Sequence, residues 1–240
     1  LFRILFSAFP MALLAYGMER LGIAGNVDAE KVLKQIKEQI LPTGAVEITR
    51  IKRQEPETVV EPYVEQNLSV AQPMFCFGFK EDGAKRTAKQ KICTCLLLEI
   101  LAGDASPLYK DLVNEGLIND EFSFEYFTGN GYASVIFDGE SNNPKAVAEK
   151  IKAEVERLKL EGIDKKLFSA IRCGMYGNAI RLFQSVDGIA MQMADCAMND
   201  SGLFDDIKYL RSVTIEDVYK RLLLLDNEKT VLSVINPKEK

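Results

Sequence analysis

The feature that most restricts the fold is the apolar segment at residues 87–102, which reads "TAKQKICTCLLLEILA". After Lys91, the only charged residue in this segment is Glu99. A helix that is apolar on nearly every side is stable only when other elements cover it on nearly every side. The segment therefore predicts a central helix that the rest of the domain covers.

The composition indicates a globular chain with a substantial core. Of the 240 residues, 47% are hydrophobic and 27% are charged, which is typical of such a protein. The net charge is -5, and the sequence contains no basic run. Because nucleic acids bind to positively charged surfaces, the charge argues against a nucleic-acid partner.

The chemistry of the chain is restricted by the absence of histidine. Without histidine, the chain can form no Ser-His-Asp or Cys-His catalytic group and no histidine-based zinc site. The number of cysteines is odd and no CxxC pair occurs, which favours free thiols in a reducing, cytoplasmic compartment. The five are Cys76, Cys93, Cys95, Cys173 and Cys196.

Strand patterns occur at residues 68–80, 119–138 and 229–235, among amphipathic helical segments. The sequence Gly-Asn-Gly at residues 129–131 predicts a hairpin turn within the second pattern. We therefore predict an α+β fold, a two-layer α/β arrangement, for residues 68–240. It consists of one mainly antiparallel sheet with helices packed on one face.

A short helix is predicted between the central helix and the hairpin, because its start and stop signals are complete. Ser106 is suited to cap the first free amides, and Pro107 follows at the first helical position. Gly116 is suited to end the helix, and Leu117 then folds back on Leu112 in a Schellman motif.

The composition changes at residues 46–67, where charged residues alternate with Pro56 and Pro62 without a sustained period. This pattern predicts an extended linker. Residues 1–45 are then the tail of a first domain, and residues 68–240 are a second domain.

Within the predicted tail, Asp28 is expected to cap an amphipathic helix at residues 29–40, and "RLGIAGNV" is expected to form a short strand and turn. The apolar run at residues 1–18 begins in mid-pattern, without an initiator Met, and Pro10 interrupts it. The run favours a buried helix over a targeting segment, because it is shorter than a membrane span. The abrupt start indicates a fragment of a longer chain.

The motifs "GNVDAEKV", "SPLYKDLVNEGLI" and "LFQSVDGIA" resemble those of the insulinase/pitrilysin-type zinc peptidases, in the bacterial YmfH-like branch. The resemblance runs from about Gly22 to Pro237 and implies the C-terminal, non-metal half of such a peptidase. In this family, an inverted motif on one helix supplies two histidines, which hold zinc together with a second glutamate downstream, while the first glutamate of the motif acts as the base. The resemblance therefore implies that zinc is held by an upstream half, and that residues 103–122 help to form the wall of a substrate chamber.

Active relatives often supply an Arg and a Tyr that hold the substrate backbone, near the strand that matches "GYASVIFDGESNNP". No arginine occurs between Arg86 and Arg157, so the arginine role cannot be assigned here. Tyr132 is the candidate substrate-binding residue that the resemblance implies. The alternative is that Tyr132 is an ordinary strand residue on a half-buried face, since strands are enriched in tyrosine.

Three functions are compatible with the sequence. The chain could complete the chamber of a zinc peptidase, with its own N-terminal half or a homologous subunit and a peptide substrate as partners. It could be an inactive homologue that serves as a scaffold or a substrate-binding subunit. It could also be a free-standing α/β binding domain. A His-x-x-Glu-His motif encoded upstream of Leu1 would distinguish the first from the second. No membrane partner is expected.

We predict that limited proteolysis cuts residues 46–66 first, because a linker is accessible to proteases while a covered helix is not. The measurement is mass spectrometry of the earliest fragments. First cuts within residues 87–102 would contradict the assignment of that helix to the core.

Overall fold

A computed structural model describes residues 23–26, 28–39, 56–84, 86–129, 131–199 and 201–238. By its contacts the chain divides into two units, one formed by residues 1–52 and 179–204 and the other by residues 53–178 and 205–240. The described elements of the first unit are α2 (Ala29–Gln39), η1 (Leu182–Gln184) and α7 (Val186–Asn199). Helix α6 (Lys165–Arg181) belongs mainly to the second unit and ends in the first.

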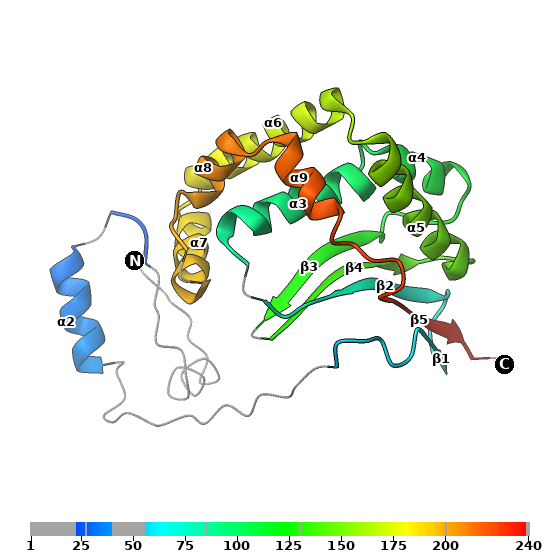
Figure 1. Ribbon diagram of the computed structural model, residues 1–240. Coiled ribbons are helices and arrows are strands. Elements are labelled where there is room, and N and C mark those ends of the chain that lie inside the picture. Colours follow the sequence, from blue (N-terminus) through cyan, green and yellow to red (C-terminus); the bar gives the residue numbers. More distant parts are fainter. Residues whose placement is uncertain are drawn as a thin grey trace. The chain divides into compact units, whose positions relative to one another are not determined.

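The described part of the second unit contains a five-stranded sheet in the order β1-β5-β2-β4-β3 (Figure 1). The strands are β1 (Tyr63–Leu68), β2 (Met74–Glu81), β3 (Ser123–Gly129), β4 (Tyr132–Glu140) and β5 (Thr230–Pro237). Only the β1–β5 pair is parallel, and the other three pairs are antiparallel. The predicted mainly antiparallel sheet is confirmed.

One face of the sheet forms the core. Phe75, Phe77 and Phe79 of β2 are buried, whereas the intervening Met74 and Cys76 are exposed. Figure 1 shows the helices of this unit on the buried face, as predicted. They are α3 (Ala88–Ala102), α4 (Pro107–Asn114), α5 (Pro144–Glu161), α8 (Asp205–Ser212) and α9 (Ile215–Leu222).

Helix α3 is the central helix that the sequence predicts. It packs against β3 and against α4, α5, α8 and α9. A capping box begins it, in which Thr87 Oγ1 accepts from the Gln90 amide (3.3 Å) and Gln90 Oε1 accepts from the Thr87 amide (2.9 Å). Among the described residues, Ala88–Asn114 is the one stretch long and apolar enough to cross a membrane. Because 67% of its apolar window is buried inside the protein, it is a core segment.

The short helix α4 has the predicted caps. Ser106 Oγ accepts a hydrogen bond from the Tyr109 amide at 3.1 Å. At the other end, the Leu117 amide donates to the Leu112 carbonyl at 2.9 Å, and the Gly116 amide donates to Val113. Gly116 has φ +66°, the left-handed conformation that a Schellman motif requires.

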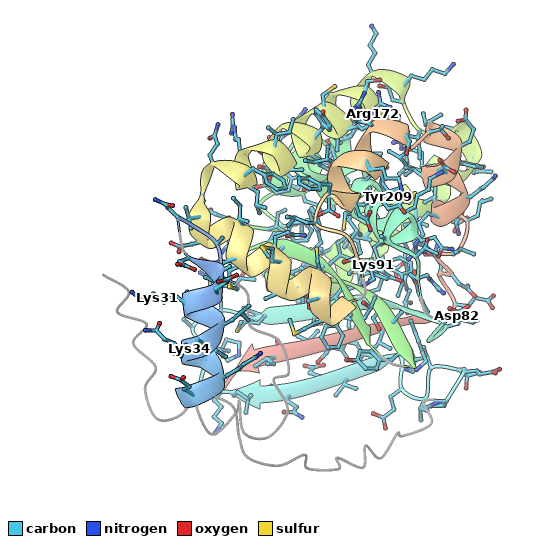
Figure 2. The ribbon with its side chains drawn as sticks, turned by 90° about the vertical axis from the view of Figure 1, so that its left-hand side faces the viewer. Lys31, Lys34, Asp82, Lys91, Arg172 and Tyr209 are labelled. Atoms are coloured by element: carbon cyan, nitrogen blue, oxygen red, sulfur yellow. The ribbon has the colours of Figure 1, made fainter. Side chains whose placement is uncertain are left out.

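The N-terminal part of the chain differs from the prediction in two places. Strand β1 lies inside the predicted linker, because residues 63–68 pair with β5. Ile23 and Ala24 are not in a strand, although a short strand was predicted around them. The predicted helix after Asp28 is confirmed as α2, whose Lys31 and Lys34 side chains extend away from the helix (Figure 2). The predictions for residues 1–22 and 40–55 lie outside the described residues.

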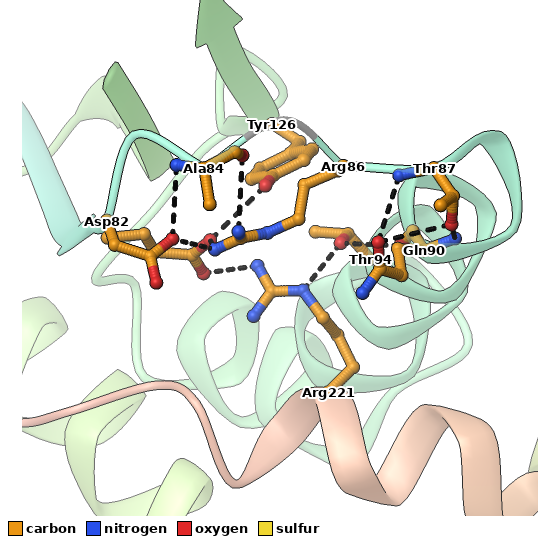
Figure 3. A network of polar contacts seen from close by, with 9 residues as sticks. Asp82, Ala84, Arg86, Thr87, Gln90, Thr94, Tyr126 and Arg221 are labelled. Atoms are coloured by element: carbon orange, nitrogen blue, oxygen red, sulfur yellow. Dashed lines mark hydrogen bonds and ion pairs between the residues drawn. The ribbon is translucent and has the colours of Figure 1, made fainter. Parts of the chain in front are cut away.

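A buried charge network joins α9 to β2 and α3 (Figure 3). Arg221 of α9 is only 4% exposed, and it forms an ion pair with Glu81 at the end of β2. Its Nε also donates to Thr94 Oγ1 of α3 at 2.7 Å, and Thr94 in turn donates to the Gln90 carbonyl. The side chain therefore ties together three elements that are distant in sequence.

A second cation shares the Glu81 carboxylate. Arg86 lies 3.5 Å from Glu81 and also pairs with Asp82, which is at the solvent-exposed end of β2 (Figures 2 and 3). The hydrogen bond from Arg86 holds the pKa of Asp82 below its usual range. The Tyr126 hydroxyl donates to Glu81 at 3.2 Å, and burial together with the Glu81 charge raises the pKa of Tyr126. Both oxygens of Glu81 are thus used within the fold.

We predict that Arg221→Met lowers the free energy of unfolding by about 3 kcal/mol, because it removes the more closely placed of the two cations that pair with the buried Glu81 and also removes the donor to Thr94. Chemical denaturation measures the change. Lys150→Met is the control, since it removes only the surface pair with Glu115 and should cost less than about 1 kcal/mol. A double variant, Glu81→Leu with Arg221→Met, should recover most of the loss. An Arg221→Met cost as small as the control would contradict this role.

Candidate functional site

The second face of the sheet carries no helix or strand of the second unit, within the residues that the structure describes. We call it the open face. Along β2 it presents Met74, Cys76, Gly78 and Lys80, which alternate with the buried phenylalanines. The neighbouring strands are in register with them, so that Asp138 of β4 and Ser233 of β5 lie beside Cys76.

A shallow pocket of about 560 Å³, here called the sheet hollow, lies on the open face. Gly78, the next outward-facing residue of β2 after Cys76, has no side chain, and a Cβ there would lie 3.2 Å from the Val135 carbonyl oxygen. The hollow combines apolar side chains with serines and carboxylates. Its lining residues are Met74, Phe75, Cys76, Ser123, Phe124, Glu125, Ile136, Asp138, Ser233 and Ile235.

Cys76 lies among acidic groups in the sheet hollow. Burial raises the pKa of its thiol, and the charges of Asp138 and Glu125 raise it further. Asp138 Oδ1 accepts a hydrogen bond from Ser123 Oγ at 2.7 Å. A nucleophilic cysteine needs a lowered pKa and a positive environment, so Cys76 is unsuited to covalent catalysis.

Tyr132, the candidate residue from sequence, lies at the start of β4 and lines a second pocket of about 640 Å³, the hairpin pocket. It is 41% exposed, and its ring centroid lies 5.4 Å from that of Phe127. The ring also covers Gly129, where any added Cβ would overlap it. The structure therefore gives the ring a packing role, and its role toward a substrate stays a prediction.

The buried carboxylate of Glu81, which lines the hairpin pocket, is already engaged within the fold. The Glu81 side chain is 2% exposed and is fully engaged by Arg221, Arg86 and Tyr126, so it cannot serve as an acid or base toward a ligand. Among the described residues, no group of three or more His, Cys, Asp or Glu is placed to hold a metal ion. What the site offers is a shaped binding surface.

The role of residues 103–122 in a chamber wall stays a prediction. Helix α4, expected at the wall of a chamber, packs against α3 and α5 in the helix layer. The residues of the sheet hollow were missed. The alternation in "MFCFGFK" marks Met74 and Cys76 as outward-facing, but it cannot show that Ser123 and Ile235 lie beside them.

Comparison with known proteins gives consistent results. The sequence model of the family described as "Peptidase M16 inactive domain" matches residues 20–174. The chain is 30% identical over 203 residues to the zinc protease YmfH of Bacillus subtilis, which is described as uncharacterized. This alignment covers 82% of the chain and 47% of YmfH, so the chain spans about half the length of that relative.

Solved structures share the fold. An M16-like peptidase from Alicyclobacillus acidocaldarius has a TM-score of 0.79 and 25% identity, over 89% of this chain and 53% of that one. A protease from Helicobacter pylori has a TM-score of 0.76 and 18% identity, over 89% and 54%. With its family match over more than half of its length, this chain belongs to the M16 zinc-peptidase family, as an inactive domain of the kind the family model describes.

Proposed function

We propose that this chain is the non-metal half of a zinc peptidase and that its open face forms one wall of the substrate chamber. The observation that carries the proposal is a sheet whose second face carries no helix of the second unit among the described residues, in a member of the M16 inactive-domain family. In this proposal, the partners are the N-terminal half of the same protein or a homologous subunit, together with a peptide.

The open face has the properties that such a wall needs. Met74 exposes an apolar side chain beside the sheet hollow, and Phe127 exposes another beside the hairpin pocket. Strand β3 pairs with β4 on one side and is the edge of the sheet on the other. The free backbone groups of an edge strand can pair with an extended peptide.

Zinc does not fit the residues of this chain. The sequence has no histidine, and burial raises the pKa of the Cys93 and Cys95 thiols, which opposes the thiolate form that binds zinc. Zinc held by another half would polarise the scissile carbonyl and activate a water molecule. The part of this chain is to bind and orient the peptide and to limit its contact with bulk water.

The domain division also belongs to this proposal. Residues 1–45 are the tail of the metal-bearing domain, residues 46–67 join the two domains, and residues 68–240 are the second domain, to which β1 contributes the edge strand beside β5. The free cysteines agree with a cytoplasmic location.

A second candidate is an inactive homologue that serves as a scaffold or substrate-binding subunit. It is supported by the lack of any arginine between Arg86 and Arg157 and by the packing of Tyr132 over Gly129. The presence of a His-x-x-Glu-His motif in the upstream coding sequence decides between the two.

We predict that the chain alone retains no tightly bound zinc after a chelator wash and hydrolyses no unfolded peptide, because it lacks a ligand set for catalytic zinc. Metal analysis and a fluorogenic peptide assay measure both. Adding the upstream half should restore tight zinc binding and peptide hydrolysis. Tight zinc with chelator-sensitive cleavage by the chain alone would refute the prediction, and a reconstituted pair without metal would favour the scaffold.

We predict that Tyr132→Phe weakens peptide binding about three-fold, the effect of losing one exposed hydrogen bond, and leaves thermal stability unchanged. Tyr132→Ala should in addition lower stability, because it uncovers Gly129 and Phe127. Peptide affinity and melting temperature, measured on both variants, separate the hydroxyl from the ring. Unchanged affinity in Tyr132→Phe would leave the ring with a packing role alone.

A further inference from the structure

The charge of the open face is unevenly distributed. Three carboxylates lie on neighbouring rows of the sheet, with Glu140 beside Met74, Asp138 beside Cys76, and Glu125 in the row of Gly78. At about 3.3 Å per residue, the strip from Met74 to Gly78 is about 13 Å long. The next row holds Lys80, and Lys80 and Lys229 line the hairpin pocket. The charge therefore changes sign along β2.

Within the described residues, the carboxylates of the strip form no ion pair with a lysine or arginine. Asp138 accepts from the Ser123 hydroxyl, and Glu140 accepts from Asn119 Nδ2 at 2.8 Å. Both donors are neutral. The negative charge of the strip also acts on Cys76 in the sheet hollow. Burial raises the pKa of the Cys76 thiol, and the charges of Asp138 and Glu125 raise it further.

The floor of the sheet hollow is apolar beside these charges. Met74, Ile136 and Ile235 line it, with Asp138 and Glu125 close by. Lysine and arginine carry a long aliphatic stem with a charged end, so they can cover apolar surface while the charge reaches a carboxylate. The carboxylate of a glutamate side chain would meet repulsion in the same place.

We propose that the sheet hollow binds an extended peptide segment through a lysine or arginine side chain, and so gives the peptidase a preference for basic segments. The expected ligand is a cationic peptide. The aliphatic stem of its lysine or arginine would contact the apolar floor, and the charged end would reach the acidic strip. This inference rests on the proposed function, since it names the substrate class of the same surface.

The test measures the affinity of the 240-residue chain for three unstructured peptides of equal length, by fluorescence anisotropy at low salt. The peptides differ only in carrying lysine, glutamine or glutamate at their central positions. The lysine peptide should bind most tightly. Glu125→Gln with Asp138→Asn should weaken it about five-fold, the sum expected for two exposed ion pairs, and should leave the glutamine peptide unaffected.

A matched control variant, Asp111→Asn with Glu149→Gln, removes the same net charge from exposed positions of α4 and α5. It should leave the lysine peptide within about two-fold of the unmodified chain, because solvent and salt screen charges that lie far from the hollow. Circular dichroism melts confirm that both double variants are folded.

Alkylation of Cys76 locates the bound peptide. The lysine peptide should slow the alkylation of Cys76 and leave that of Cys173, on the exposed side of α6, unchanged. Without peptide, the Glu125→Gln, Asp138→Asn variant should alkylate faster at Cys76, because neutralising these two charges lowers the pKa of the thiol.

Equal binding of the three peptides with protection of Cys76 would overturn the charge preference and leave the proposed function in place. The charge preference would also be overturned if the control variant lost as much affinity for the lysine peptide as the Glu125→Gln, Asp138→Asn variant does. Absence of Cys76 protection by every peptide would count against the open face as a substrate surface, and so against the proposed function as well.

Discussion

The burial of α3 is the constraint on which the second unit depends. A helix with isoleucine and leucine on several sides has no surface that is stable in water, so neighbours must cover it all round. The sheet lies on one side, and α4, α5, α8 and α9 cover the others. All these helices therefore pack on one face of the sheet. Among the described residues, no helix of the second unit covers the other face. The open face is a consequence of how one helix is buried.

Strand β2 contributes to both the core and the open face, because its residues alternate between the two faces of the sheet. In the core, Phe77 stacks on Phe137 and Phe79 meets the same ring edge-on, while Met74 and Cys76 line the sheet hollow on the open face. At its end, Glu81 turns from the sheet into the Arg221 network. A buried pair of this kind adds little net stability, but it penalises any arrangement that separates its members. It fixes α9 in one position over α3.

Local signals in the sequence were sufficient for the helices, their caps, the hairpin and the layering. Ser106 and Gly116 act on backbone groups within a few residues, so their effect can be read from a short window. Strand β1 was missed because "YVEQNL" is polar and becomes a strand only through pairing with β5. The sheet hollow and the Glu81–Arg221 pair were missed for a related reason. Glu81 and Arg221 are 140 positions apart, and the hollow brings Met74 beside Ile235, so no short window contains both partners.

The strand order has a consequence for how the protein is made. Strand β5 is the last strand of the domain to leave the ribosome, yet it lies between β1 and β2 in the sheet. Until it emerges, β1 lacks its pairing with β5, and the edge of β2 that later receives β5 is exposed. Closing such distant contacts is slow, and an unpaired apolar strand can join a neighbouring chain. The nascent chain therefore passes through a period in which its core is unfinished, and protection by chaperones is most useful during that interval.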